Sequence, residues 1–123
     1  MHHSRLTALG IDVPAETHAV SANFWAGALG RNFEPDGDGT YLNLGRVSGL
    51  EIFVQRLGQG GPRFHLDIET DDVDAEVARL EGLGATRVEQ VNTWWVMGDP
   101  AGNLFCVVPP QTNDFPADAV TWP

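Results

Sequence analysis

The sequence predicts an α+β protein made of two βαβββ units. One observation behind this is the order of elements, because a strand, a helix and short strands follow one another twice along the chain. A second is that each predicted helix stops at a Leu-Gly pair, Leu29-Gly30 in the first half and Leu83-Gly84 in the second. The third is a glycine-rich joint at 57–62 between the halves.

These signals also set the expected domain organisation. A chain of 123 residues fits a single domain, so we assign 1–123 to one domain. The first unit is placed at about 5–57, the second at about 63–109, and a proline-rich tail at 110–123. Three placements of the tail remain open, namely on a neighbouring subunit, over the ligand site, or in solvent.

The first unit opens with a predicted strand at 6–13, where apolar residues alternate until Pro14 ends the pattern. Residues 15–29 predict a helix, because Val20 and Phe24 recur at a spacing of four and continue an apolar stripe. The remaining strands of this unit are predicted at 41–45 and 50–55, each preceded by turn-forming residues.

The second unit repeats this order. Residues 63–69 alternate as a strand, and 71–83 predict an amphipathic helix with Asp71 as its N-cap. A tight turn at 99–103 separates the last two strands. The short strands of this unit are predicted at 86–91, 93–97 and 104–108.

The charge balance excludes some partners. Seven arginines and no lysine face 17 acidic residues, for a formal net charge of -10. Nucleic acids and anionic membrane surfaces both require basic protein surfaces, so neither is an expected partner. No stretch approaches the roughly 18 apolar residues of a membrane span. The single cysteine, Cys106, fits a reducing compartment, and we expect a cytoplasmic protein.

Much of the acidity gathers at the start of the second helix. Acidic residues there complement the helix dipole, so we expect this cluster to be mainly a solvated feature of the surface. The stretch lacks the central glycine and terminal glutamate of a calcium loop. The six carboxylates are Asp67, Glu69, Asp71, Asp72, Asp74 and Glu76.

Several segments resemble the vicinal oxygen chelate superfamily, and within it the small glyoxalase-like and bleomycin-resistance-like proteins. The most specific is the Asp-Pro-Ala-Gly-Asn turn at 99–103, which precedes a terminal apolar strand. The other matching segments lie at 23–30, 63–67 and 77–86. The resemblance implies that the two units form a cupped mixed β-sheet around a cavity, with the helices outside.

Metal-dependent members of this superfamily bind a divalent ion through four inward side chains. Carried over by position, the resemblance places His65 at the fifth-strand histidine and Glu51 at the fourth-strand glutamate, so these two are the metal candidates. Cys106 stands where a glutamate is expected on the eighth strand. The first-strand position falls on a residue without a ligating side chain, namely Leu6, Ala8 or Gly10. The quartet is therefore incomplete; we expect no cofactor, with a divalent metal as the alternative.

His65 and Glu51 are also the predicted catalytic residues. The strand parity of His65 points it into the cavity, where it would act as a general base on a carbon or oxygen acid. Its alternative is a neutral, hydrogen-bonded histidine without a chemical role. Glu51 would be the partner acid or base, and its alternative is an edge residue that faces water.

The ligand site is expected to combine aromatic and polar side chains. Trp94 and Trp95 are adjacent on a strand and so face opposite sides, which leaves one of them for the cavity. Cys106 lies in an apolar run, where a cysteine is usually an inert small hydrophobe. The predicted ligand-binding residues are Phe53, Gln55, Asp67, Trp94, Trp95 and Cys106.

Two functions follow from this sequence. The first is the binding of a small organic ligand in a glyoxalase-like fold. The alternative is a lyase or isomerase of the lactoylglutathione-lyase type, which would use His65 and Glu51 with or without a metal. Because dimers are common in the superfamily that the chain resembles, a homodimer is expected.

Overall fold

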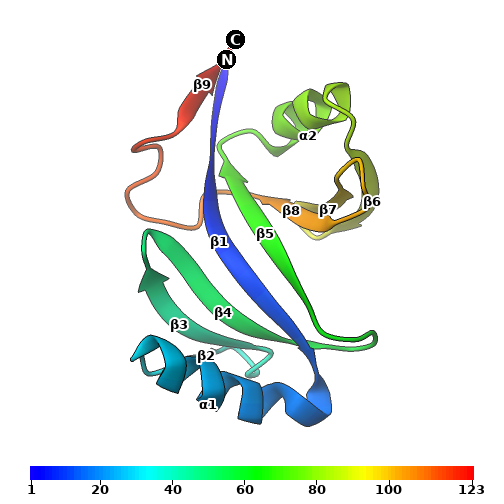
Figure 1. Cartoon of the computed structure of the whole chain (residues 1–123). Coiled ribbons are helices and arrows are strands. Elements are labelled where there is room, and N and C mark those ends of the chain that lie inside the picture. Colours follow the sequence, from blue (N-terminus) through cyan, green and yellow to red (C-terminus); the bar gives the residue numbers. More distant parts are fainter. The chain divides into compact units, whose positions relative to one another are not determined.

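The computed structural model describes residues 1–123 and confirms the α+β class and the two βαβββ repeats (Figure 1). The first repeat consists of β1 (His2–Pro14), α1 (His18–Leu29), β2 (Glu34–Asp36), β3 (Tyr41–Val47) and β4 (Leu50–Leu57). The second consists of β5 (Arg63–Thr70), α2 (Val73–Gly82), β6 (Thr86–Val91), β7 (Trp94–Gly98) and β8 (Leu104–Val108). A 3-10 turn at Ala15–Thr17 leads into α1, and β9 (Val120–Trp122) follows β8.

The strands pair in the order β2-β3-β4-β1-β5-β8-β7-β6, and β9 pairs with the start of β1. In each repeat the first strand runs parallel to the last, β1 to β4 and β5 to β8, whereas the short strands pair antiparallel. A parallel pair needs a long crossover, which the helix and the intervening strands supply. The mixed sheet predicted from the sequence is therefore confirmed.

The chain divides into two compact units. The N-terminal unit is Ala8–His65, and the C-terminal unit combines Met1–Thr7 with Leu66–Pro123. The division passes through β1 and β5, so each of these strands contributes to both units. The predicted units at 5–57 and 63–109 follow the repeat along the sequence. In the fold, by contrast, residues 1–7, which include the first part of β1, belong to the C-terminal unit.

One face of the sheet in the N-terminal unit packs against α1. Alternate residues of β1, β3 and β4 supply this core together with Ala22 of α1: Ile11, Val13, Leu42, Leu44, Ile52 and Val54. His18 anchors the start of α1, because its Nε2 lies 3.0 Å from the carbonyl oxygen of Val54. The intervening residues of the strands point to the face opposite α1.

The C-terminal unit buries a second core beneath α2. Val77, Met97 and Val107 are fully buried there, and Trp95 packs against them. The N-cap of α2 is Asp72, whose side chain accepts a hydrogen bond from the amide of Ala75, rather than the predicted Asp71. The N-cap prediction was therefore wrong by one position.

The C-terminal tail folds onto its own unit. β9 pairs antiparallel with the first residues of β1, and Figure 1 shows the two chain ends side by side. Nε1 of Trp122 donates a hydrogen bond to Oγ of Ser4 at 2.9 Å, and the guanidinium of Arg79 lies 3.7 Å from the centre of the indole ring. These contacts hold the tail against the chain's own first strand.

Two strands were not predicted. β2 consists of Glu34, Pro35 and Asp36, all exposed, and forms the outer strand beside β3. A polar, proline-containing edge strand has no alternation of apolar residues that sequence patterns could detect. β9 lies in the tail and has only three residues, which is too short for a sequence pattern to predict a strand. Neither helix is long and apolar enough to cross a membrane.

Candidate functional site

A buried pair of side chains, His65 and Asp12, marks the candidate site in the N-terminal unit. Nδ1 of His65 lies 2.7 Å from Oδ2 of Asp12, and the two residues are 9% and 3% exposed. An ionised carboxylate only accepts hydrogen bonds, so we assign the proton of the neutral imidazole to Nδ1. Nε2 of His65 is then the nitrogen with a lone pair.

Gly10 provides the space for the imidazole ring. A Cβ atom built on Gly10 would lie 2.3 Å from Cε1 of His65, far inside van der Waals contact. Any residue with a side chain at this position would therefore displace the ring. The absence of a side chain at Gly10, one of the candidate first-strand positions, thus has a structural role in seating His65.

One aromatic ring, that of Phe53, lies against His65, and a second, that of Tyr41, lies against Phe53. The ring of Phe53 lies 5.6 Å from the imidazole and 5.6 Å from the ring of Tyr41, both in edge-on geometry. Phe53 is the register partner of Gly10, and Gln55 is the register partner of Asp12. The predicted ligand-binding residues Phe53 and Gln55 therefore share the face opposite α1 with the His65–Asp12 pair.

The carboxylate of Asp12 has a second oxygen that is also buried. Oδ1 of Asp12 accepts no hydrogen bond within the chain, whereas Oδ2 lies near both His65 and Nε of Arg63, the latter at 3.6 Å. Buried carboxylate oxygens are normally satisfied by donors. Oδ1 is therefore a buried acceptor that the chain itself leaves without a donor.

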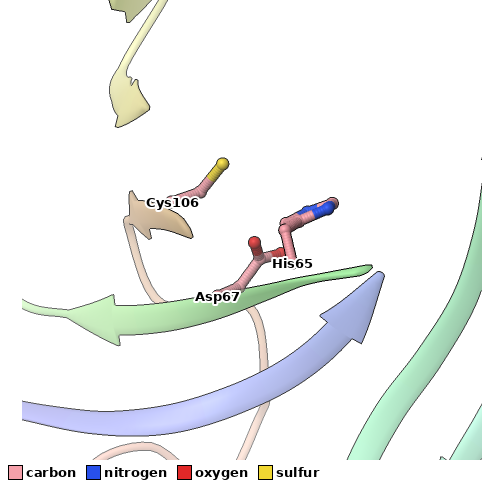
Figure 2. A group of neighbouring side chains, drawn as sticks. All are labelled: His65, Asp67 and Cys106. Carbon is pink, nitrogen blue, oxygen red and sulfur yellow. The ribbon is translucent and has the colours of Figure 1, made fainter. Parts of the chain in front are cut away.

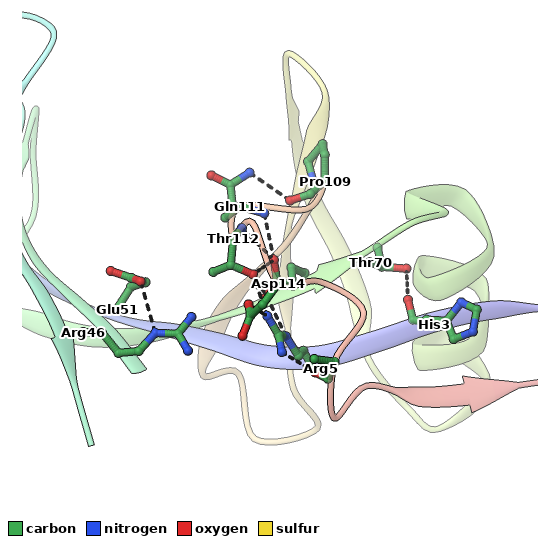
Figure 3. Close-up of polar contacts among 11 residues, drawn as sticks. His3, Arg5, Arg46, Glu51, Thr70, Pro109, Gln111, Thr112 and Asp114 are labelled. Atoms are coloured by element: carbon green, nitrogen blue, oxygen red, sulfur yellow. Dashed lines mark hydrogen bonds and ion pairs between the residues drawn. The ribbon is translucent and has the colours of Figure 1, made fainter. Parts of the chain in front are cut away.

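Glu51 lies on the same face but has a different environment. Its side chain is 40% exposed, and Oε1 lies 3.5 Å from Nε of Arg46, its cross-strand partner (Figure 3). Its neighbour across the parallel pair is Ala8, which carries no ligating atom. The buried carboxylate bonded to His65 is thus Asp12, while Glu51 forms an ion pair at the surface.

The donor atoms on β5 and β8 form a small cluster (Figure 2). His65 and Asp67 lie two residues apart on β5, and Asp67 is the register partner of Cys106 on β8. One ligand atom from each of these three residues lies within 4.8 Å of the other two. A histidine nitrogen, a carboxylate oxygen and a thiolate are the donors that zinc accepts, and three protein ligands leave one position for substrate.

The tryptophans of β7 point to opposite faces of the sheet. Trp95 packs in the core beneath α2, with the guanidinium carbon of Arg87 5.0 Å from its ring centre. Val96 is the register partner of Cys106, so Trp94, two residues from Val96, shares the face of Cys106. Trp94 is thus the tryptophan that faces away from α2.

Next to Asp67 on the same face of β5, Glu69 is completely buried. Its carboxylate accepts hydrogen bonds from Nε of Arg5 at 2.8 Å, from the amide of Gln111 at 2.7 Å and from the amide and hydroxyl of Thr112. Burial opposes ionisation of Glu69, but these hydrogen bonds outweigh it and hold the pKa of the carboxyl below its usual value.

A second buried carboxylate, Glu76 of α2, is held in the same way. It accepts hydrogen bonds from Arg79 at 2.8 and 2.9 Å and contacts Nε2 of His2 at 2.8 Å. Burial opposes its ionisation, yet these contacts lower its pKa. The acidic cluster is therefore not merely a solvated surface, because Glu69 and Glu76 are internal.

Asp12 is the functional candidate that sequence reasoning missed. A signal was present, because Asp12 is the one charged residue in an otherwise apolar or small stretch at 6–13. A carboxylate on a strand that is buried on both faces is rarely left unpaired. Its partner could not be read from the sequence, since His65 lies 53 residues away.

A protein-family model confirms the resemblance. The model described as a glyoxalase-like domain matches residues 8–108. The chain therefore belongs to the glyoxalase-like domain family, with the fold of the vicinal oxygen chelate superfamily. No curated protein matches the chain.

Solved structures agree with this assignment. A hypothetical protein from Bacillus halodurans is 14% identical with a TM-score of 0.61, covering 90% of this chain and 99% of that one. An NAD-dependent benzaldehyde dehydrogenase from Legionella pneumophila is 13% identical with a TM-score of 0.58, covering 80% and 96%. A methylmalonyl-CoA epimerase is 16% identical with a TM-score of 0.54, covering 89% and 96%. At these identities the likeness shows the fold alone.

Proposed function

We propose that this protein binds a small organic compound with an acidic C–H or O–H group beside His65 and removes a proton from that group, as an isomerase or lyase does. The observation that carries the proposal is the 2.7 Å contact between buried Asp12 and Nδ1 of His65. A base needs a lone pair directed at the substrate, and Asp12 fixes the ring so that Nε2 has it. An ionised Asp12 also stabilises the imidazolium that forms when Nε2 takes the proton.

The substrate class follows from a histidine base. An imidazole removes a proton from a carbon that is made acidic by a neighbouring carbonyl or thioester, or from a hydroxyl. The C–H bond breaks, its electron pair delocalises into the carbonyl as an enolate, and the proton moves to Nε2 of His65. Return of the proton to another atom or face completes an isomerisation. The edges of Phe53 and Tyr41 supply apolar contact for the carbon skeleton.

In an alternative mechanism, Nε2 of His65 would bind a divalent metal instead of acting as the base. His65, Asp67 and Cys106 would hold it, and the ion would polarise a substrate carbonyl as a Lewis acid. Because Asp12 contacts Nδ1 of His65, either role would fall to Nε2. Glu51 is not one of these three ligands. It would influence the metal site only through its negative charge, which lies in an ion pair with Arg46.

Ligand binding without turnover is the second candidate function. The observation in its favour is on the first strand, where none of the candidate positions for the first ligand of the family quartet, Leu6, Ala8 or Gly10, carries a ligating side chain. Ala8 is the one of these that lies beside Glu51. A face with aromatic rings and few metal ligands suits a protein that sequesters a small molecule. We also propose that the protein is cytoplasmic and acts as a homodimer.

Hydrogen exchange into substrate distinguishes these functions. Compounds with an acidic C–H, including methylmalonyl-CoA and the hemithioacetal of methylglyoxal and glutathione, are first screened for binding by tryptophan fluorescence. Bound compounds are then incubated with protein in D₂O, and loss of the C–H signal is followed by proton NMR. We expect the exchange rate to fall about 100-fold or more in His65→Gln.

Glu51→Gln is the matched control for this experiment, since it removes one carboxylate from the same face and leaves the Asp12–His65 pair intact. Its exchange rate should stay within a few-fold of the wild type. Equal exchange in the wild type and His65→Gln contradicts the proposal. Tight binding without exchange in the wild type supports sequestration instead.

A further inference from the structure

Arg63 is a cation on the same face of β5 as His65, two residues before it. Its charged neighbour is Asp12, whose Oδ2 lies 3.6 Å from Nε of Arg63, an ion-pair distance that is too long for a hydrogen bond. The side chain of Arg63 is 44% exposed. A guanidinium has five N–H donors, so Arg63 has donors left for another molecule.

Most of the other arginines are used inside the chain. Five of the seven each donate a hydrogen bond to another side chain, namely Arg5, Arg46, Arg56, Arg79 and Arg87. The two that do not are Arg31 and Arg63. Arg31 is exposed just after the end of α1, away from the site face. Arg63 is therefore the cation of the site face that no side chain of the protein binds through a hydrogen bond.

The glycine-rich joint before β5 leaves this guanidinium uncovered. A Cβ atom built on Gly60 would lie 3.3 Å from Nη1 of Arg63, so a side chain at this position would press against the guanidinium. The φ of +95° at Gly60 also favours glycine. Both the backbone and the free approach to Nη1 therefore suit a residue without a side chain.

The charges around Arg63 favour one kind of ligand. In a chain with a net charge of -10, an anionic substrate needs a local cation, and the planar fork of a guanidinium fits a carboxylate through two parallel hydrogen bonds. Asp12 already lies beside this guanidinium. It would repel a dianionic phosphate about twice as strongly as a carboxylate, because the Coulomb energy scales with charge.

The spacing of Arg63 and His65 sets the size of that ligand. Residues two apart on a strand lie about 6–7 Å apart, so a carboxylate at Arg63 would place the next carbon atoms of a short molecule beside His65. We infer that Arg63 binds the carboxylate of the substrate, and that the substrate is a short carboxylic acid with an acidic C–H next to a carbonyl group. This inference rests on the proposed function, because it names the class of compound on which His65 would act.

Acetoacetate and its methyl ester are the probes, because both have an acidic C–H between two carbonyl groups and they differ by one negative charge. Dissociation constants come from ligand-detected NMR titrations of the full chain up to about 20 mM, the range of weak small-molecule binding. Acetoacetate should bind about tenfold or more tightly than the ester and than inorganic phosphate. It should also shift the Nε–H signal of Arg63, which is assigned by its loss in Arg63→Gln.

Arg63→Gln should raise the dissociation constant of acetoacetate about tenfold or more and leave that of the ester within a few-fold of the wild type. Unchanged binding of the ester shows that the variant is folded. Arg63→Lys keeps the charge without the planar fork, so its affinity should fall between the two. Arg31→Gln is the matched control, because it removes the same charge outside the site and should leave both constants unchanged.

Equal binding of acid and ester overturns the inference, and so does a preference for acetoacetate that persists in Arg63→Gln. Tighter binding of phosphate, or no binding of acetoacetate in this range, overturns it as well. His65→Gln separates the inference from the proposed function, since it should keep the preference for acetoacetate. A preference that depends on Arg63 in a protein without proton exchange supports the carboxylate site and contradicts the proton transfer. Exchange that is equal in the wild type and Arg63→Gln contradicts the carboxylate site alone.

Discussion

Asp12 and His65 lie 53 residues apart in the sequence, yet their side chains form a buried hydrogen bond of 2.7 Å between Oδ2 and Nδ1. The bond joins β1 and β5, the first strands of the two repeats, each of which precedes the helix of its own repeat. It determines which nitrogen of His65 can act on another molecule. The chemistry proposed for this protein depends on that bond.

Gly10→Ala tests whether the position of the His65 ring requires a residue without a side chain at position 10. The new Cβ would lie 2.3 Å from Cε1, so the ring must move and its bond to Asp12 must lengthen or break. We expect a loss of about 1–3 kcal/mol in the free energy of unfolding, together with loss of proton exchange into substrate. Gly61→Ala is the control, because a Cβ there meets no atom. Unfolding free energies in urea report the difference, and equal values for the two variants would be the contrary result.

Zinc should inhibit the proposed proton transfer. Nε2 of His65 serves either as the base or as a metal ligand, because Asp12 holds Nδ1. Added zinc is therefore expected to slow exchange into a bound probe, and Cys106→Ser should weaken this inhibition because it removes the thiolate from the set of three donors. Exchange rates measured against zinc concentration decide the point. Zinc that accelerates exchange would favour the metal-dependent alternative.

Acid should destabilise the C-terminal unit through Glu69. Its pKa is lowered in the fold below the usual value of 4.5, so its hydrogen bonds contribute fully above about pH 4.5. This contribution is lost as the pH falls below 4.5 through the folded-state pKa. Glu69→Gln should reduce stability at neutral pH and flatten the acid limb of the stability profile. The exposed Glu34→Gln is the control, and an unchanged limb in Glu69→Gln would show that Arg5 and Thr112 are not its stabilising partners.

The tail should contribute to stability through Trp122. Trp122→Ala removes both the hydrogen bond to Ser4 and the stacking on Arg79, and we expect a loss of about 1–3 kcal/mol. Trp122→Phe keeps a ring over Arg79 and should lose about 1 kcal/mol. Thermal or urea unfolding measures both, with Val120→Ala as the control. If all three variants match the wild type, the tail is not held as described.

The repeat could be predicted from local pattern, whereas much of the site could not. Alternating apolar residues and the Leu-Gly stops are local signals, and they specified both βαβββ units. β2 was not predicted because its three residues, Glu34, Pro35 and Asp36, show no alternation of apolar side chains. The positions of His65, Phe53 and Gln55 on one face came from strand parity and the family resemblance.

Partners that are distant in the sequence account for what was missed. Asp12 reaches His65 across 53 residues, and Glu69 reaches Arg5 across 64. Glu76 was predicted to be one of the solvated acids, but it is buried beside His2, which lies 74 residues away in the sequence. Only the fold shows that these charges are paired.

The most direct test of the account is the protonation of the His65 ring, measured by nitrogen NMR of protein labelled in its histidine side chains. His65 can be assigned by the loss of its signals in His65→Gln. At a pH where the ring is neutral, we expect Nδ1 to carry the proton and Nε2 to have the lone pair. In Asp12→Ala this preference should weaken or reverse. A ring protonated at Nε2 in the wild type, or one indifferent to the loss of Asp12, would contradict the proposal that His65 is an oriented base.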